Sequence, residues 1–223
     1  MKRIVLFVEG DGDVAAVPLL AKKLLTERNA WDAVFLDVDP FRVGQINKIV
    51  KNDFREWIKK LSASLKRQNV GGILLILDGD IKRVGNELFC AATVAKSLAR
   101  VARTVGAGST FSVATVFAKR EYESWLLASA ESFAGKTFPD GRKVPANITV
   151  PAGDLEEGPR AAKEWLQNAI GGDYRSTRDQ VTLTQWLEPE LIRKRDMRSF
   201  KRLESALNEL VDAIRTGEHV ATP

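Results

Sequence analysis

Cysteine and histidine are nearly absent from this chain of 223 residues, which contains one of each. The single cysteine, Cys90, excludes an intrachain disulfide, and its place in a predicted helix of small residues indicates an ordinary buried thiol. The single histidine, His219, lies far along the sequence and makes a Ser-His-Asp or Cys-His catalytic site implausible. Zinc sites built from spaced cysteines and histidines are excluded as well.

Long apolar runs and phosphate-binding glycine motifs are also missing. No stretch approaches the roughly 18 consecutive apolar residues of a membrane-spanning helix. The first residues run directly into a strand pattern without signal-peptide features, so we expect a cytoplasmic protein with no membrane partner. No Gly-x-x-x-x-Gly-Lys-Ser/Thr sequence is present, which excludes a P-loop NTPase. Gly10-Asp11-Gly12 lacks the third glycine of a dinucleotide fingerprint, and its acid would oppose a pyrophosphate.

Carboxylates follow two short apolar runs. Residues 3–8 lead into Glu9-Gly10-Asp11-Gly12-Asp13, and residues 73–77 lead into Asp78-Gly79-Asp80. Both runs are rich in β-branched residues, which predicts buried strands. Ligands bind beyond the carboxyl ends of the strands in α/β sheets, so these acids converge if the two strands are neighbours. Hard oxygen ligands suit Mg²⁺ or Mn²⁺. The expected ligands are Glu9, Asp13, Asp78 and Asp80.

Most of these acids also have a plainer structural interpretation. Asp-Gly is common in turns, so Asp78-Gly79-Asp80 alone is weak evidence for a metal site. Glu9 has no obvious capping role and adds weight to the metal interpretation. Asp13 can serve as the N-cap of the following helix, bind a metal, or do both. Asp11 is expected to be an exposed turn residue. An aspartyl-phosphate phosphatase would leave Glu9 without a role.

A third acidic group follows the apolar run at residues 111–117. It contains Glu121 and Glu123 and opens a predicted helix, where acids also interact favourably with the helix dipole. Because this is again a strand end that leads into a helix, one of the two glutamates can reach the other acids. Both are therefore candidate metal ligands.

The charge is mildly basic, with 34 basic and 29 acidic residues and a formal net charge of +5. This fits a polyanionic partner without requiring one. A basic segment near an acidic metal site would suit a nuclease, because it positions phosphates beside the cation-dependent chemistry. A solvated helix face explains the same pattern equally well. The candidate nucleic-acid-binding residues are Arg193, Lys194, Arg195, Arg198, Lys201 and Arg202.

The order of the expected elements indicates an α/β fold. Strands alternate with helices, which implies a mostly parallel sheet with helices on both faces. Gly71-Gly72 is expected to end the second helix. The predicted strands cover residues 3–8, 33–38, 73–77 and 111–117, and the predicted helices between them cover 13–28, 46–66 and 86–105.

The second half has a different character. We predict an α/β core over residues 1–133 and an irregular insert or linker over 134–158, which is rich in proline and glycine. A helical C-terminal extension over 159–216 is expected to pack on the core. Pro159 suits a first helical turn, and the last few residues, including His219, are expected to be frayed. The helical patterns of this extension cover residues 159–170, 177–187 and 196–215.

These motifs resemble a known pattern. A glutamate after the first strand and Asp-x-Asp after a later strand look like the TOPRIM fold, the catalytic module of topoisomerases, primases and overcoming-lysogenization-defect (OLD) nucleases. Glu9-x-x-x-Asp13 is similar to the Glu-x-x-x-Asp of the OLD-type nucleases. The whole chain resembles the TOPRIM-like family catalogued as domain of unknown function 4276. The segments that carry this resemblance are Val8-Glu9-Gly10 with Asp13, Leu77-Asp78-Gly79-Asp80, Arg120-Glu121-Tyr122-Glu123-Ser124-Trp125, Asp179-Gln180 with Leu183, and Ser199-Phe200.

The resemblance implies divalent cations, Mg²⁺ or Mn²⁺, and phosphodiester chemistry. By motif position, Glu9 is a general acid/base or a metal ligand, and Asp78 and Asp80 are metal ligands. Asp13 matches the second acid of the OLD type, and Lys163 is our assignment for its later lysine. Members of the family often occur in bacterial defence and mobile-element contexts beside ATPases.

The leading hypothesis is metal-dependent hydrolysis of phosphodiester bonds in nucleic acid. Topoisomerase and primase activities are disfavoured, because the chain's two tyrosines lie in no recognisable catalytic context. The alternative is a non-catalytic module that binds nucleic acid or a partner ATPase, and a regulator that responds to a small phosphorylated ligand is a third hypothesis. In the nuclease scheme, a first metal would be held by Glu9, Asp13 and Asp78, and a second by Asp80 with Glu121 or Glu123.

Overall fold

The computed structural model of the chain describes residues 1–157 and 162–222. Its centre is a six-stranded sheet in the order β2-β1-β4-β7-β8, with β3 also paired to β1, and all of these pairings are parallel. The strands are β1 (Lys2–Val8), β2 (Val34–Leu36), β3 (Phe41–Arg42), β4 (Val70–Asp78), β7 (Ser112–Ala118) and β8 (Ala221–Thr222), and β5 (Arg83–Val84) pairs separately with β6 (Glu87–Leu88). The helices are α1 (Asp11–Glu27), α2 (Ile46–Ser64), α3 (Ala91–Arg103), α4 (Glu123–Ala128), α5 (Ala162–Ala169), α6 (Ser176–Trp186), α7 (Pro189–Lys194) and α8 (Arg198–Thr216), with a 3₁₀ turn at Ala130–Phe133.

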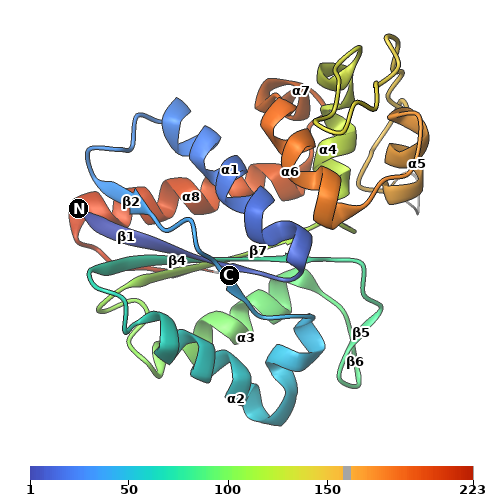
Figure 1. Cartoon of the computed structure of the whole chain (residues 1–223). Helices are drawn as coiled ribbons and strands as arrows, with labels where there is room; N and C mark the ends of the chain where they lie inside the picture. The colour runs from blue at the N-terminus through green and yellow to red at the C-terminus, as the bar shows by residue number, and fades with distance from the viewer. Residues whose placement is uncertain (158–161, 223) are drawn as a thin grey trace.

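Helices cover both faces of the sheet, so the predicted α/β class is confirmed. In Figure 1, α1 and α8 lie above the sheet, and α2 and α3 lie below it. Successive side chains of a strand point to opposite faces. Ile4 and Leu6 accordingly belong to the apolar cluster under α1 and α8, whereas Val5 and Phe7 belong to the cluster over α2 and α3. No helix in the described part of the chain is long and apolar enough to cross a membrane.

The strand β4 lies at the centre of the sheet because it is apolar on both faces. Its residues 73–77 are at most 5% exposed, and it pairs with β1 on one side and β7 on the other. Gly71 and Gly72 belong to this strand, so the prediction that they end a helix is wrong. A Cβ at Gly71 would lie 2.7 Å from the Cβ of Lys2, and the glycine therefore permits the close approach of β1.

The predicted helix over residues 86–105 is wrong at its beginning. The chain first forms the hairpin β5–β6 around Gly85, whose φ of +60° is accessible to glycine, and α3 begins only at Ala91. Cys90 is exposed just before α3, so the expectation of a buried thiol is also wrong. In Figure 1 the hairpin projects from the body of the molecule, beyond the carboxyl end of β4.

The helix α2 is interrupted within the range predicted as one continuous helix, residues 46–66. Residues 52–54 have φ values of 52°, 53° and 61°, in the left-handed region that side chains disfavour. Ile49 before this turn and Trp57 after it are both buried in the same core, and the indole N–H of Trp57 donates to the carbonyl of Leu98 at 3.1 Å. These two anchors hold the interrupted helix against the sheet.

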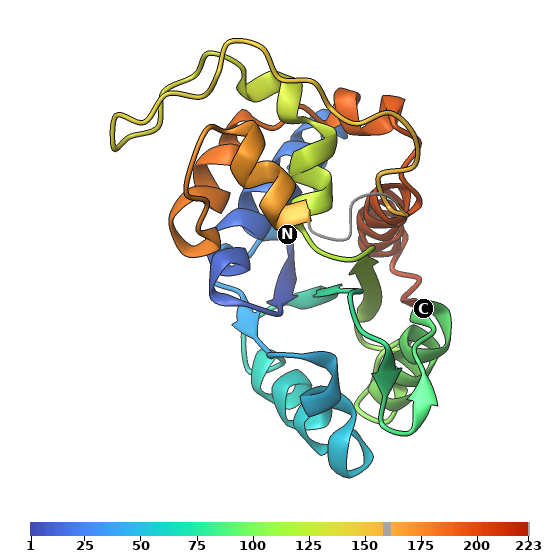
Figure 2. The same cartoon turned by 90° about the vertical axis from the view of Figure 1, so that its right-hand side faces the viewer.

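The C-terminal half packs onto the α1 face of the sheet. Residues of α1, α4, α6 and α8 share one apolar cluster with that face. Residues 134–157 contain no helix and one isolated bridge, Thr137 to Lys143, and form the long connection that extends across the top of Figure 2. The predicted helix start at Pro159 lies outside the described residues. The short helix α7 was not predicted, because it lies between the two expected helical patterns.

The segment around His219 is ordered by the sheet, so the prediction that it frays is wrong. The strand β8 pairs in parallel with β7, and the N–H of Val113 donates to the carbonyl of Val220 at 2.8 Å. The Nδ1 of His219 lies 3.4 Å from the Oγ of Ser112. A strand as short as β8 has no alternating apolar pattern that would reveal it in the sequence. It forms because the edge of β7 is open to pairing.

Candidate functional site

Glu9 and Asp78 meet at the carboxyl edge of the sheet, because their strands are neighbours. The N–H of Asp78 donates to the Oε2 of Glu9 at 3.1 Å. Burial raises the pKa of Glu9, the hydrogen bond from Asp78 partly opposes this rise, and the negative charge of Asp13 adds to it. The predicted convergence of the first two acidic motifs is thus present in the structure for these two residues.

Asp78 is half-buried and is fixed by the segment that follows β7. Its Oδ1 accepts a hydrogen bond from the backbone N–H of Tyr122 at 3.0 Å. Burial raises the pKa of Asp78 well above its usual value, and the charges of Asp13, Glu123 and Glu9 raise it further. Four carboxylates from three segments are therefore close enough to repel one another.

Gly79 allows this approach. Its N–H donates to the carbonyl of Ala118 at 2.8 Å, and a Cβ at this position would lie 2.9 Å from the same oxygen. A side chain there would push the ends of β4 and β7 apart. The glycine of the Asp-Gly-Asp motif thus keeps Asp78 within reach of the Tyr122 N–H.

Asp13 belongs to the first turn of α1, where it is the third helical residue and not the predicted N-cap. Gly10 precedes the helix, and its N–H donates to the Oδ2 of Asp13 at 2.9 Å. The Oδ1 of Asp13 accepts a hydrogen bond from the Nε2 of Gln180 at 2.8 Å. A Cβ at Gly12 would lie 2.2 Å from the Oε1 of Gln180, so the glycine lets α6 pack directly on the beginning of α1.

Glu121, Glu123 and Lys163 form a second group beside the first. The Nζ of Lys163 lies 3.1 Å from the Oε1 of Glu121 and 3.7 Å from the Oε1 of Glu123. Glu123 is buried and also accepts a hydrogen bond from the hydroxyl of Tyr174 at 3.0 Å. Burial raises the pKa of Glu123 to about 6, although the charge of Lys163 opposes the rise. Burial lowers the pKa of Lys163, but Glu123 and Glu121 reverse this and leave it raised.

Asp80 and Asp11 are placed differently from the other acids. Asp80 is exposed and makes no hydrogen bond or ion pair within residues 1–157 and 162–222. Asp11 is exposed at the first position of α1 and forms an ion pair with Arg42. The role of Asp80 as a metal ligand therefore stays a prediction.

The described residues contain no group of three or more Asp, Glu, His or Cys side chains arranged to hold a metal ion. The carboxylates accept hydrogen bonds from protein donors instead, as the contacts of Glu9, Asp78 and Asp13 show. Their oxygen atoms nevertheless have the chemistry that Mg²⁺ and Mn²⁺ prefer. Burial is the largest cause of the raised pKa values of Glu9, Asp78 and Glu123, and neighbouring carboxylates raise each of them further. By donor type and charge these residues fit a divalent cation, which would require their side chains to turn toward it.

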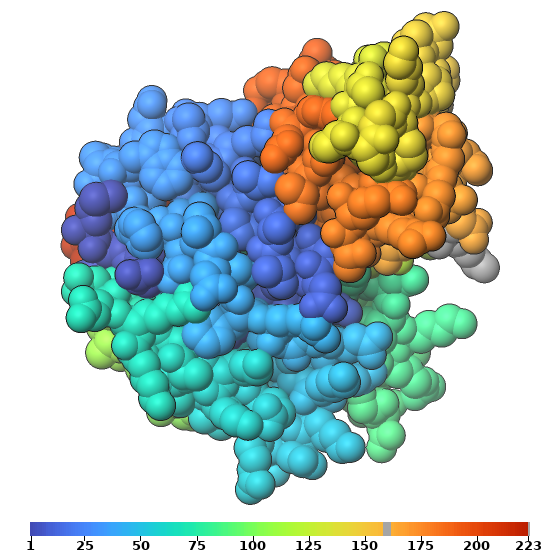
Figure 3. Space-filling view, viewed as in Figure 1, coloured from blue at the N-terminus to red at the C-terminus, as the bar shows by residue number. Residues whose placement is uncertain are grey.

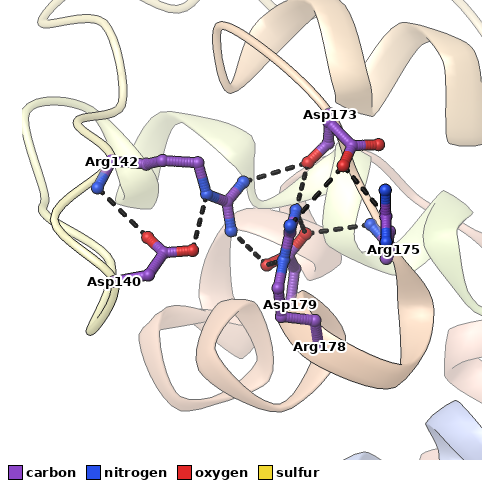
Figure 4. Close-up of polar contacts among 6 residues, drawn as sticks. All are labelled: Asp140, Arg142, Asp173, Arg175, Arg178 and Asp179. Atoms are coloured by element: carbon purple, nitrogen blue, oxygen red, sulfur yellow. Dashed lines mark hydrogen bonds and ion pairs between the residues drawn. The ribbon is translucent and has the colours of Figure 1, made fainter.

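A compensated acidic cluster lies nearby in the same lobe, and Figure 4 shows it. Asp179 on α6 is 1% exposed and is contacted by the guanidinium groups of two arginines and the backbone N–H of a third. Arg178 Nε donates to its Oδ1 at 2.7 Å, the N–H of Arg175 donates to its Oδ2 at 2.9 Å, and Arg142 also pairs with its Oδ1. Burial raises the pKa of Asp179, but these hydrogen bonds outweigh burial and leave it lowered. The cluster fixes the beginning of α6, which carries Gln180 to Asp13.

The comparison with known proteins identifies the family of the chain. The family described as "Domain of unknown function (DUF4276)" matches residues 8–208. The chain belongs to this family. The match spans both the acidic edge of the sheet and the helices α4 to α7, as well as the first half of α8, so the DUF4276 region includes Gln180 together with the acids that it contacts. No curated protein and no solved structure matches the chain.

The basic residues predicted to bind nucleic acid lie on or beside α7 and α8 of this DUF4276 chain, and most form ion pairs. Arg193 pairs with Glu27, Glu190 and Glu204. The other pairs are Arg195 with Glu131, Arg198 with Glu156 and Glu157, Lys201 with Asp196, and Arg202 with Glu209. Lys194 is exposed. Much of this positive charge is thus matched by neighbouring acids.

Three contributors to the site were not found by sequence reasoning. They are the amide of Gln180, the hydroxyl of Tyr174 and the backbone N–H of Tyr122. Asp179-Gln180 and Tyr122 belong to the segments that carry the family resemblance, but the resemblance assigns no role to them. No sequence signal gives the role of Tyr174, because its partner lies 51 residues away along the chain.

Proposed function

We propose that this DUF4276 chain is a TOPRIM-like nuclease, related to the OLD type, that hydrolyses phosphodiester bonds of nucleic acid in the cytoplasm with Mg²⁺ or Mn²⁺. The observation that supports the proposal is the contact of Glu9 with Asp78 at the carboxyl edge of a parallel sheet, where the nearby charges of Asp13 and Glu123 raise the pKa of Asp78 further than burial alone. Carboxylates that repel one another in a partly buried site gain from a shared cation. Perturbed acids in such a location are typical of functional sites.

Side chains and backbone groups of the chain orient the carboxylates. Gln180 and the Gly10 N–H hold the two oxygens of Asp13, and the Tyr122 N–H holds one oxygen of Asp78. A divalent cation on these aspartates and Glu9 would supply a bound water of lowered pKa and stabilise charge on the phosphate oxygens. The residues proposed for a second cation are Asp80 with Glu121 or Glu123.

Lys163 provides a positive charge that belongs to the chain itself. Its Nζ lies between Glu121 and Glu123 and is half-exposed. An ammonium in this position can donate to a phosphate oxygen of the substrate while it balances the nearby glutamates. Tyr174 keeps the Oε1 of Glu123 on the side of the site that faces Lys163.

Cleavage assays test the proposal directly. Purified protein is incubated with plasmid DNA, single-stranded DNA and RNA in the presence of Mg²⁺ or Mn²⁺. We expect Asp78→Ala combined with Glu9→Ala to lower the cleavage rate by more than about 100-fold, because cation binding is lost. Glu87→Ala, which removes an exposed acid from the neighbouring hairpin, is the matched control. Cleavage that survives the double substitution rules the proposal out.

A second candidate is a non-catalytic module that binds nucleic acid or a partner ATPase. It is favoured by the finding that no three metal-binding side chains in the described part of the chain surround one point. In that case the acids are structural, and binding proceeds without turnover. A chelator would then leave binding unchanged, and Mn²⁺ would stabilise neither the wild type nor its variants.

A further inference from the structure

A pocket of about 320 Å³ lies where α2 begins, and cationic side chains line it. Lys48, Lys51 and Arg55 are exposed, and none of them forms an ion pair with an acid of the described chain. The lining also contains Val43, Asn52 and one acid, Glu56. The pocket therefore keeps positive charge available to a ligand, in contrast to the arginines of α7 and α8.

The backbone places this pocket beside the acidic edge. The N–H of Val43, which lines the pocket, donates to the carbonyl of Val8 at 2.9 Å. The N–H of the next residue, Gly44, donates to the carbonyl of Glu9 at 3.2 Å. In Figure 3 the light-blue surface of this segment borders the dark-blue surface at the beginning of α1. A ligand in the pocket is thus next to the strand end that carries Glu9.

The interruption of α2 forms one side of the pocket. Asn52 is the first of the three residues in left-handed conformation, and it lies between Lys51 and Arg55 in the lining. Each such residue costs about 1 kcal/mol or more and persists only where the surrounding structure holds it. Here the buried side chains of Ile49 and Trp57 hold both ends of the turn. Strain of this kind is concentrated at binding and functional sites.

We propose that this pocket binds the phosphate backbone of a nucleic-acid strand that continues to the acidic edge. The inference rests on the proposed function, because it assigns a binding surface to that site. Phosphate contacts by lysine and arginine fix the position of a strand without reading its sequence. Three such contacts beside Glu9 would hold the strand while the phosphate to be cleaved lies among the carboxylates.

Binding is measured without turnover, by fluorescence anisotropy of a labelled single-stranded oligonucleotide in EDTA. We expect the triple variant Lys48→Ala, Lys51→Ala, Arg55→Ala to raise Kd at least tenfold at low salt. The slope of log Kd against log salt should fall by about 2, since each lost contact removes about 0.7 for a single strand. Thermal unfolding checks that the variant is folded, which its exposed positions favour.

The matched control removes the same charge elsewhere. Lys22→Ala, Lys96→Ala, Arg100→Ala also replaces two lysines and one arginine at exposed positions. It should change Kd by less than threefold. Equal weakening in both triple variants would show general electrostatic attraction and overturn the inference. Stronger weakening by Lys194→Ala, Arg198→Ala, Lys201→Ala than by the pocket variant would also overturn it.

The cleavage assay separates this inference from the proposed function. If the wild type binds through the pocket in EDTA but does not cleave with Mn²⁺, the binding site stands and the nuclease proposal fails. If the wild type cleaves and the pocket variant keeps an unchanged KM, the nuclease proposal stands and the binding site fails.

Discussion

Asp78 and Asp179 are both withdrawn from solvent, yet their surroundings drive their ionisation in opposite directions. Asp179 is contacted by the guanidinium groups of Arg142 and Arg178, and its pKa is lowered. Asp78 is surrounded by other carboxylates and accepts its hydrogen bond from a neutral backbone N–H, and its pKa is raised well above the usual value. Burial raises the pKa of both; at Asp179 the hydrogen bonds from the arginines outweigh it, whereas at Asp78 the charges of neighbouring carboxylates add to it.

The burial of an acid alone therefore does not indicate a cation-binding site. Around Asp179 the chain supplies the cations that the acids need, and the result is a fixed helix start. Around Asp78 the neighbouring charges are those of other carboxylates, and the cation that we propose there would relieve their repulsion. We expect the two regions to respond in opposite ways to neutralisation, to pH and to metal.

Replacement of either aspartate by the neutral asparagine should give the largest difference in stability between the two regions. Asp179→Asn is expected to lower the free energy of unfolding by about 2 to 3 kcal/mol, because charge-assisted hydrogen bonds are lost at a buried position and solvent screens the partly exposed arginines. Asp78→Asn should leave it unchanged or raise it by up to about 1 kcal/mol, because repulsion is relieved. Urea unfolding at pH 7 measures both. A larger loss at Asp78 than at Asp179 would contradict the comparison.

The dependence of stability on pH should follow from the same contrast. Glu123 has a folded-state pKa of about 6, raised from 4.5, so stability falls as pH increases between these values, by roughly 1 to 2 kcal/mol. Asp179, whose pKa is lowered from 3.8, contributes stability above that pH and loses it as pH decreases through its folded pKa. Urea unfolding from pH 3 to pH 8 tests this. Glu123→Gln should reduce this fall, and Glu9 and Asp78, whose pKa values are also raised, account for the fall that remains. An undiminished fall in the variant would contradict the contribution of Glu123.

Mn²⁺ at ten times its Kd should raise the free energy of unfolding by about 1.4 kcal/mol wherever its binding site is intact. The wild type and Asp179→Asn should both be stabilised, whereas Asp78→Asn should not be. Thermal unfolding with and without Mn²⁺ gives the measurement, and Mg²⁺ provides the comparison ion. Stabilisation that survives Asp78→Asn would place the ion elsewhere in the molecule.

Gln180 connects the two regions, and its removal should have the smallest effect. Gln180→Ala is expected to lower the free energy of unfolding by about 1 kcal/mol, because Asp13 loses a hydrogen-bond donor. A double-mutant cycle with Asp13→Asn measures the interaction itself. An interaction energy near zero would mean that α6 does not orient Asp13.

The strand ends were predictable from sequence, because a run such as residues 73–77 is apolar on both faces and is followed by Asp-Gly-Asp. The meeting of Glu9 with Asp78 followed from the topology of parallel sheets. The hairpin at Gly85 was missed because residues 86–105 also have a helical pattern. The left-handed turn of α2 was missed because Ile49 and Trp57, on either side of it, still fit the apolar side of one continuous helix. The donors Gln180 and Tyr174 were missed because polar residues distant in sequence give no periodic signal.

The contact at Gly12 has a consequence for protein engineering. Since α6 packs on this glycine with no room for a methyl group, the acidic edge and α6 are one physical unit, although Gly12 and Gln180 are 168 positions apart in the sequence. A transplant of the edge into another sheet would have to bring α6 with it, together with the arginines that fix its first turn. The smallest portable form of this site is therefore a discontinuous graft, and no single stretch of the chain contains it.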